Sequence, residues 1–276
     1  MARVLIVGAG YIGLPLANVL RQAQNEVFII KRRPIELTVD HAIHPIYGDL
    51  FDLTDLPNVD AIIYLVSADG REQAFYEKAY IDGPEKIIQL YRNRMPKRFI
   101  FGSSTAVYPF TEGEWVDESI TLPTASEMNG KILQDAEAQI STFHCDHVIA
   151  RLGGLYGPGR YHIIDRMRKG EFKMTNHPIY TNRIHQTDCI SALQFIFDML
   201  NPESIYNLVD SHPTPVNEIV AWISTKLGVP APTPSQTTNH FYSKTNKRVS
   251  NARLLGAGFE FTYPSYINGY EPLLSE

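Results

Sequence analysis

Short apolar runs rich in β-branched residues alternate with segments of helical length along the chain. Within these runs, apolar and polar residues do not alternate strictly, which is typical of strands buried on both faces of a parallel sheet. Strands that alternate with helices predict a doubly wound α/β fold. The expected strands are 4–7, 26–30, 61–66, 98–101, 148–152 and 205–209, and two clear expected helices are 11–24 and 215–227.

The alternation becomes less regular after residue 155, where Gly-Pro-Gly at 157–159 marks a loop. We therefore expect residues 1–155 to form one domain, with 183–210 returning to it. Segments 156–182 and 211–276 are expected to form a small C-terminal lobe.

Composition narrows the class of protein. The 276 residues carry a net charge of −5, which argues against a dedicated nucleic-acid-binding protein. The longest apolar run, 61–66, is far shorter than the ~20 residues of a membrane span. Two cysteines, Cys145 and Cys189, fit a reducing compartment. We expect a cytoplasmic protein with no membrane or nucleic-acid partner. We expect no metal site, because the His-Cys-Asp-His cluster at 144–147 lacks a second ligand pair.

A glycine-rich turn directly follows the first expected strand and opens the first expected helix. In such a turn the glycines permit close approach of a pyrophosphate, and the helix N-terminus supplies N–H groups. This context predicts a dinucleotide-binding Rossmann-like domain and leaves the C-terminal lobe for the substrate; the alternative is a purely structural turn. The predicted binding residues are Gly8, Gly10, Tyr11, Ile12 and Gly13.

The end of the second expected strand indicates which dinucleotide binds. NAD-binding domains of this kind place an Asp or Glu there to hold the ribose 2′-hydroxyl. This chain instead has Lys31, Arg32 and Arg33. Guanidinium groups bind a phosphate bidentately, whereas a carboxylate would repel it. We predict a preference for NADP(H) over NAD(H); the alternative is that the three cations form a solvated loop face.

Several further segments resemble the extended short-chain dehydrogenases/reductases of the NAD-dependent epimerase/dehydratase superfamily. They are GDL at 48–50, FGSSTAVY at 101–108, RLGGLYGPG at 151–159 and RIHQTD at 183–188. The order of the segments matches and the resemblance spans nearly the whole chain. More narrowly, the chain is similar to the atypical YeeZ-like group.

This resemblance implies roles for residues outside the glycine-rich turn. Asp49 would meet the adenine amine, with Leu50 and Ser67 also lining the cofactor site. Lys131 would contact the nicotinamide ribose, and Ser104 would polarise a substrate oxygen, unless its hydroxyl only caps a local turn. Family members often pair through helices, so a homodimer is implied by analogy.

Glu127 occupies the position where the family has its catalytic tyrosine, four residues before Lys131. A carboxyl group could act as the general acid or base if burial kept it protonated, whereas a lysine one helical turn away would keep it ionised. The alternatives are an ion pair on a helix face without catalytic role, or another proton donor such as Tyr108 or Tyr156.

The substrate is less well indicated. Nucleotide-sugar enzymes of this type carry an Asn where this chain has Gly154. We expect Arg160, Lys247 and Arg248 each to be an ordinary solvated surface cation; the alternative is that they bind a phosphate or carboxylate. We expect an NAD(P)-binding oxidoreductase or epimerase/dehydratase-like enzyme acting on a small hydroxyl or carbonyl substrate, sugar-derived ones included. The alternative is a non-catalytic NADP(H)-binding regulatory or redox-sensing protein.

Overall fold

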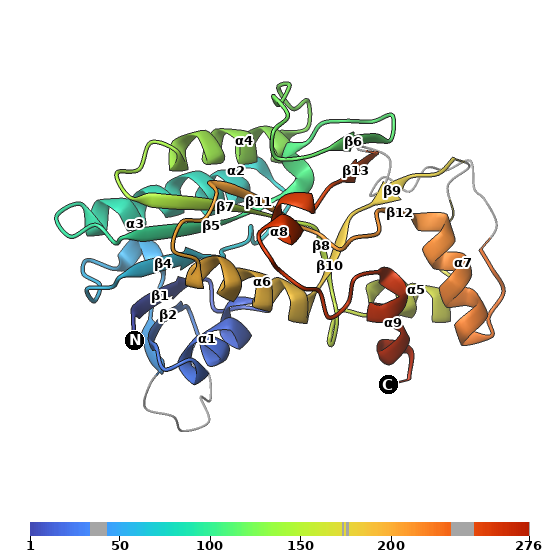
Figure 1. Ribbon diagram of the computed structural model, residues 1–276, viewed down its shortest axis with the longest axis horizontal. Coiled ribbons are helices and arrows are strands. Elements are labelled where there is room, and N and C mark those ends of the chain that lie inside the picture. The colour runs from blue at the N-terminus through green and yellow to red at the C-terminus, as the bar shows by residue number, and fades with distance from the viewer. Residues whose placement is uncertain (34–42, 173, 175–176, 233–245, 276) are drawn as a thin grey trace. The chain divides into compact units, whose positions relative to one another are not determined.

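The computed structural model describes residues 1–33, 43–172, 174, 177–232 and 246–275 (Figure 1). The chain divides into two compact units. The first comprises Met1–Val107, Met128–Arg151 and Ile190–Tyr206, and the second comprises Tyr108–Glu127, Leu152–Cys189 and Asn207–Glu276. The segment 108–127, expected in the first domain, thus groups with the C-terminal part of the chain, and the roles of the two units stay predictions.

A seven-stranded sheet forms the centre of the fold, in the order β11-β7-β5-β4-β1-β2-β3. β1 pairs in parallel with both β2 and β4, and the outer pairs β2·β3 and β4·β5 are also parallel. The strand order therefore reverses beside β1, and the predicted doubly wound α/β fold is confirmed. The strands are β1 Arg3–Val7, β2 Glu26–Lys31, β3 Ile43–Tyr47, β4 Ala61–Tyr64, β5 Arg98–Ser104, β7 Asp146–Leu152 and β11 Ile205–Leu208.

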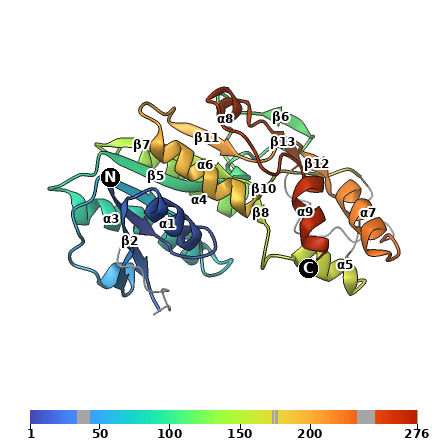
Figure 2. The same cartoon turned by 60° about the horizontal axis from the view of Figure 1, so that its bottom comes forward.

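Helices cover both faces of this sheet. Figures 1 and 2 show α1 (Gly13–Gln22) and α6 (Gln186–Asp198) on one face and α3 (Gly83–Tyr91) and α4 (Met128–Ile140) on the other. Alternate residues of each strand serve the two faces: Leu5 and Val7 join the core under α3 and α4. Residues between them, such as Ile6, face α1. This double burial explains why the strands read as continuous apolar runs. The connections add α2 Gln73–Glu77 and the short turns η1 Leu50–Asp52, η2 Lys78–Asp82 and η3 Thr105–Val107.

The second unit has its own core, built from α5 (His162–Arg168), α7 (Val216–Leu227) and α9 (Tyr266–Leu274). Short two-stranded pairings complete it. They are β6 (Glu114–Val116) with β13 (Lys247–Val249), β8 (Gly154–Tyr156) with β10 (Arg183–His185), and β9 (Tyr180–Thr181) with β12 (Thr214–Pro215). The short helix α8, Ala252–Gly256, follows β13. Across the described residues, every helix is too short or too polar to cross a membrane.

Candidate functional site

The turn between β1 and α1 requires glycine at two positions and leaves open space at a third. Gly8 has a φ of +100°, and an added Cβ would lie 2.7 Å from the backbone of Leu65 on the neighbouring strand connection. A Cβ on Gly13 would lie 2.3 Å from the carbonyl oxygen of Gly8. At Gly10, by contrast, nothing in the described chain comes within 4 Å of an added Cβ. This opening at a helix N-terminus fits a pyrophosphate group.

A cavity of about 720 Å³ lies in the first unit at the carboxyl ends of β1, β2 and β4. This is where open α/β sheets bind their ligands, at the point where the strand order reverses. The predicted cofactor residues that line it are Gly8, Gly10, Lys31, Arg32, Arg33, Asp49, Leu50 and Ser67. Tyr11, Ile12, Gly13 and Lys131 are not among its lining residues, so the structure gathers eight of the twelve predicted cofactor positions.

The three cations after β2 have different surroundings. The Lys31 Nζ atom donates a 2.9 Å hydrogen bond to the carbonyl of Ala9 and so braces the glycine-rich turn. Arg32 pairs with Asp69 through two hydrogen bonds of 2.5 Å and 2.8 Å. Arg33 is exposed and has no hydrogen-bond or ion-pair partner within the described part of the chain. Lys31 is thus engaged with the turn, whereas Arg32 and Arg33 are the guanidinium-bearing residues among the described residues that line the cavity.

Asp69 was not anticipated from the sequence, because it belongs to no motif and lies 37 residues from Arg32 along the chain. Its hydrogen bonds with Arg32 hold the pKa of this carboxyl below its ordinary value. Lys78, also missed, lines the same cavity and lies over the ring of Phe51, 4.7 Å from its centroid. Among the described residues the cavity rim thus has four cations, and two of them pair with carboxylates, Arg32 with Asp69 and Lys78 with Asp49.

Asp49 has a structural function in addition to its predicted cofactor role. Its Oδ1 atom accepts a 3.1 Å hydrogen bond from the backbone N–H of Phe51 and caps η1. Its Oδ2 atom lies 3.9 Å from the Nζ atom of Lys78. These contacts fix the carboxylate at the cavity wall next to the buried Leu50.

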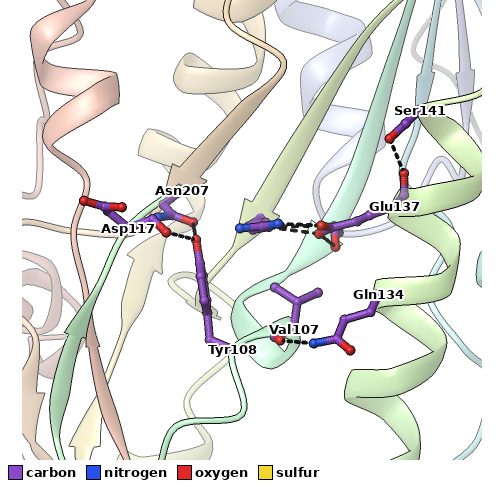
Figure 3. A network of polar contacts seen from close by, with 9 residues as sticks. Val107, Tyr108, Asp117, Gln134, Glu137, Ser141 and Asn207 are labelled. Atoms are coloured by element: carbon purple, nitrogen blue, oxygen red, sulfur yellow. Dashed lines mark hydrogen bonds and ion pairs between the residues drawn. The ribbon is translucent and has the colours of Figure 1, made fainter. Parts of the chain in front are cut away.

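A buried ion pair between Glu137 and Arg151 joins α4 to β7 of the sheet (Figure 3). Glu137 of α4 accepts hydrogen bonds from Arg151 of β7 and a 2.6 Å hydrogen bond from the hydroxyl of Ser103. The Ser104 hydroxyl, one residue on, accepts a 3.2 Å bond from the N–H of Ala106. That contact matches the turn-capping alternative, while the hydroxyl hydrogen remains able to donate. Lys131 is exposed in the first turn of α4.

The structure places Glu127 immediately before the helix that carries Lys131. Helix α4 begins at Met128, and Lys131 lies in its first turn. Glu127 is half-buried.

The two tyrosines considered as substitute proton donors are packed inside the second unit. Tyr108 is fully buried, and its hydroxyl lies 2.9 Å from the Oδ1 atom of Asn207, to which it donates (Figure 3). Tyr156 stacks on Tyr270 with 4.5 Å between ring centroids, and burial raises the pKa of its phenol. Both phenols are therefore part of the core of the second unit.

The three cations that were considered as ligands for an anionic group also have different surroundings. Arg160 is exposed. Arg248 packs between the rings of Trp115 and Tyr180, 5.2 Å and 4.9 Å from their centroids. Lys247 is only 4% exposed, so the expectation of a solvated surface cation is wrong for this residue. The reason is its place on β13, where alternate side chains turn inward.

Within the described ranges, no group of three or more His, Cys, Asp or Glu side chains is placed to hold a metal ion. The cluster at 144–147 lies where the chain enters β7, and burial raises the pKa of the Cys145 thiol to about 11.

A glycine-rich turn at the switch point of a parallel sheet, beside a cavity rimmed by cations, defines a nucleotide-binding α/β protein. The chain belongs to the NAD dependent epimerase/dehydratase family, which its sequence matches over residues 4–189. This confirms the resemblance to extended short-chain dehydrogenases/reductases. No curated protein matches the sequence significantly.

Solved structures of similar proteins extend over nearly the whole chain. A candidate NAD-dependent epimerase/dehydratase from Methylobacillus flagellatus is 28% identical, with a TM-score of 0.80, and the match covers 99% of this chain and 98% of that one. Human epimerase family protein SDR39U1, solved with NADPH, is 19% identical, with a TM-score of 0.80 and 99% of both chains covered.

The UDP-glucuronic acid 4-epimerase from Bacillus cereus, solved with UDP-glucuronic acid and NAD, has the same fold. It is 15% identical, with a TM-score of 0.82 and coverage of 99% of this chain and 98% of that one. At these identities the human and Bacillus proteins establish the shared fold. Structures of proteins with this fold have thus been solved with NADPH and with NAD.

Proposed function

We propose that this chain binds NADP(H) in the cavity of its first unit and acts as an oxidoreductase or epimerase/dehydratase-like enzyme on a small hydroxyl or carbonyl substrate. The observation that carries the proposal is the gathering of Gly8, Gly10 and three consecutive cations around one cavity. Cationic rims favour a ligand with several phosphate charges.

The glycine-rich turn is suited to a pyrophosphate. Gly10 leaves the space open that such a group needs, and the N-terminus of α1 supplies N–H donors and the positive end of a helix dipole. Lys31 holds the turn through the Ala9 carbonyl, so its ammonium both braces the backbone and adds positive charge beside the site.

The preference for NADP(H) rests on Arg32 and Arg33, since proteins of this fold bind either cofactor. Arg33 has no partner among the described residues, so it can reach a 2′-phosphate without breaking a described contact. Arg32 needs to exchange the carboxylate of Asp69 for that phosphate. This exchange is favourable because the phosphate carries more charge and more acceptor oxygens than the carboxylate.

A bound nicotinamide supplies hydride transfer. Ser104, at the end of β5, would donate its hydroxyl hydrogen to a substrate oxygen and so polarise it. Lys131, at the start of α4, would bind the ribose hydroxyls. Glu127 would take or return the proton of a substrate hydroxyl, which is the task that a tyrosine performs elsewhere in the family.

A second function is favoured by the absence of a phenol at position 127. A chain that keeps the cofactor cavity but lacks the usual acid–base group could bind NADP(H) without turnover and signal the cofactor's state to a partner. The burial of Tyr108 and Tyr156 in the core favours this alternative, because a buried phenol is poorly placed to reach a substrate.

Thermal unfolding of the full chain with saturating NADPH, NADP+, NADH or NAD+ tests the binding proposal. A ligand at 100 times its Kd adds about 2.7 kcal/mol of stability, which is roughly 5 °C or more in Tm for a chain of this size. We expect clear shifts with NADPH and NADP+ and smaller shifts with the other two. No shift with any of the four would overturn the proposal.

Arg33→Gln locates the 2′-phosphate. Loss of a charge-assisted hydrogen bond should weaken NADPH binding about 10-fold or more and leave NADH binding unchanged. Arg92→Gln, which removes an exposed charge at the end of α3, is the matched control and should change neither. Equal weakening of both cofactors by Arg33→Gln would remove the assignment.

A further inference from the structure

Lys247 is a buried lysine on a strand whose backbone is fixed on two sides. β13 pairs with β6 along its whole length, with Lys247 opposite Glu114 (Figure 1). On its other edge the side-chain amide of Asn182 donates to the carbonyl of Lys247 and accepts from the N–H of Val249, at 3.0 Å and 2.7 Å. The chain therefore has little freedom to turn Lys247 out to solvent.

The alternation along β13 places the Lys247 side chain on the inner face. Lys247 and Val249 are 4% and 1% exposed, whereas Arg248 between them packs on the aromatic rings at the surface. A lysine at an inward position is unusual, because ordinary soluble proteins rarely bury this side chain without an acidic partner.

No acidic partner is present for this ammonium group among the described residues. Glu114, opposite it on β6, uses its carboxylate to accept a 2.8 Å hydrogen bond from the backbone N–H of Glu112. No described carboxylate lies within ion-pairing distance of the Nζ atom of Lys247. Residues 233–245, which precede β13 in the sequence, contain no Asp or Glu.

A buried ammonium group that has no carboxylate partner destabilises a protein, since it loses hydration without gaining a counter-charge. Such groups persist where they bind a ligand or take part in chemistry. Burial lowers the pKa of Lys247 to about 8, so most of these side chains still carry a charge at pH 7. An anion that reached the amine would therefore meet a positive charge in surroundings of low polarity.

We propose that Lys247 is an anion-binding residue that recognises a carboxylate or phosphate group of a small-molecule ligand. This inference rests on the proposed function in one respect: we take the ligand to be the substrate. The substrate would then be an anionic hydroxyl or carbonyl compound. Recognition by a buried ammonium favours an anion strongly over a neutral compound of the same shape, because the neutral compound leaves the charge unpaired.

Thermal unfolding of the full chain in sodium phosphate, sodium acetate and sodium chloride of equal ionic strength tests this inference. The variants are Lys247→Met, which keeps the length of the side chain, and Lys169→Met, which removes an exposed lysine of the same unit. We expect phosphate or acetate to raise the Tm of the wild type and of Lys169→Met saturably, by about 5 °C at 100 times the Kd. Lys247→Met should lose this shift and unfold a few degrees higher than the wild type without any anion.

The two anions distinguish the sources of the negative group: a phosphate-only shift assigns a phosphorylated ligand, and an acetate shift assigns a carboxylate. An anion shift of the same size in Lys247→Met would overturn the proposal, as would the absence of any shift in the wild type. General salt effects on folding appear equally in all three proteins.

A measurement on the wild type avoids any dependence on the folding of a variant. Reductive dimethylation with formaldehyde, followed by mass spectrometry, should modify Lys247 several-fold more slowly when the effective anion is present, while Lys169 reacts at an unchanged rate. An unchanged rate at Lys247 would count against the proposal. Cofactor shifts are recorded separately, so a failure of NADP(H) binding and a failure of anion binding give different results.

Discussion

The guanidinium group of Arg32 and the carboxylate of Asp69 face each other in a two-bond ion pair at the rim of the cofactor cavity, with separations of 2.5 Å and 2.8 Å. Their side chains are 62% and 53% exposed. Exposed ion pairs contribute roughly 0–1 kcal/mol, so a competing phosphate can displace this carboxylate at low cost. If the chain binds NADP(H) as we propose, Asp69 competes with the 2′-phosphate for Arg32, and it should tune the affinity for NADP(H) without abolishing it.

Asp69→Asn should strengthen NADPH binding by about two- to fivefold, because Arg32 no longer has to leave an ionised partner and the 2′-phosphate no longer meets a nearby negative charge. NADH lacks that phosphate, and its Kd should stay within about twofold. Isothermal titration calorimetry measures both values. Asp135→Asn, on the exposed side of α4, makes the same change in net charge away from the cavity and should leave both unchanged. An equal gain for NADH would contradict the competition.

Glu137 should be the most costly single carboxylate to remove from the first unit. It accepts hydrogen bonds from Arg151 and Ser103, and the side chains of the Glu137–Arg151 pair are only 7% and 4% exposed. Glu137→Gln leaves the arginine buried without a counter-charge and should lower the free energy of unfolding by roughly 3–5 kcal/mol. Urea unfolding followed by circular dichroism measures the loss.

The exposed pair of Lys226 and Glu271 provides the contrast for that measurement, because Lys226→Met breaks an ion pair of similar length that lies in solvent. Its loss should cost less than about 1 kcal/mol. A similar small effect from Glu137→Gln would mean that Arg151 finds another acceptor, and that α4 does not depend on this pair for its position.

The parts of the site that the sequence predicts are those encoded locally. The turn at Gly8 and Gly13 was predictable because strand, glycines and helix follow one another within a dozen residues, and the backbone conformation they require admits almost no other residue. The cations after β2 were predictable for the same reason. The fold class followed from the spacing of buried strands.

Contacts between distant segments were not predictable from one sequence. Asp69 meets Arg32 only because the connections after β2 and β4 end at the same edge of the sheet. The burial of Lys247 depends on a strand of three residues, too short for its alternation to be recognised. Glu137 did leave a signal: it stands among apolar positions of α4, with Leu133 and Ile140 one turn away, which indicates a buried acid in need of a partner.

The stability of the second unit should fall in mildly acidic solution because of His185. This side chain is 2% exposed, and its Nδ1 atom accepts a 3.2 Å hydrogen bond from the N–H of Thr187, which requires the neutral ring. Burial lowers the pKa of His185 to about 4 from its ordinary 6.5. The unfolded chain therefore binds this proton first, and stability is lost as the pH falls from about 6.5 to about 4, by up to about 3 kcal/mol.

Urea unfolding between pH 7 and pH 4 measures this dependence. His185→Asn keeps a carbonyl acceptor where Nδ1 lies but cannot titrate, so its stability should fall less steeply over the same interval than that of the wild type. The difference between the two proteins isolates His185 from the other histidines. Parallel pH profiles would show that His185 does not control the acid stability.

Glu127 decides between the enzymatic and the non-catalytic function. Glu127→Gln keeps the shape of the side chain and removes its ability to exchange a proton, so NADPH-dependent reduction of carbonyl compounds should fall at least about 100-fold while the Kd for NADPH stays within about twofold. Ser104→Ala should also lower kcat, because it removes a donor to the substrate oxygen, whereas Asp135→Asn should leave turnover unchanged. If Glu127→Gln retains full activity, another group carries the proton; if the wild type itself turns over no substrate while Glu127→Tyr does, the chain has kept the cavity and lost the chemistry.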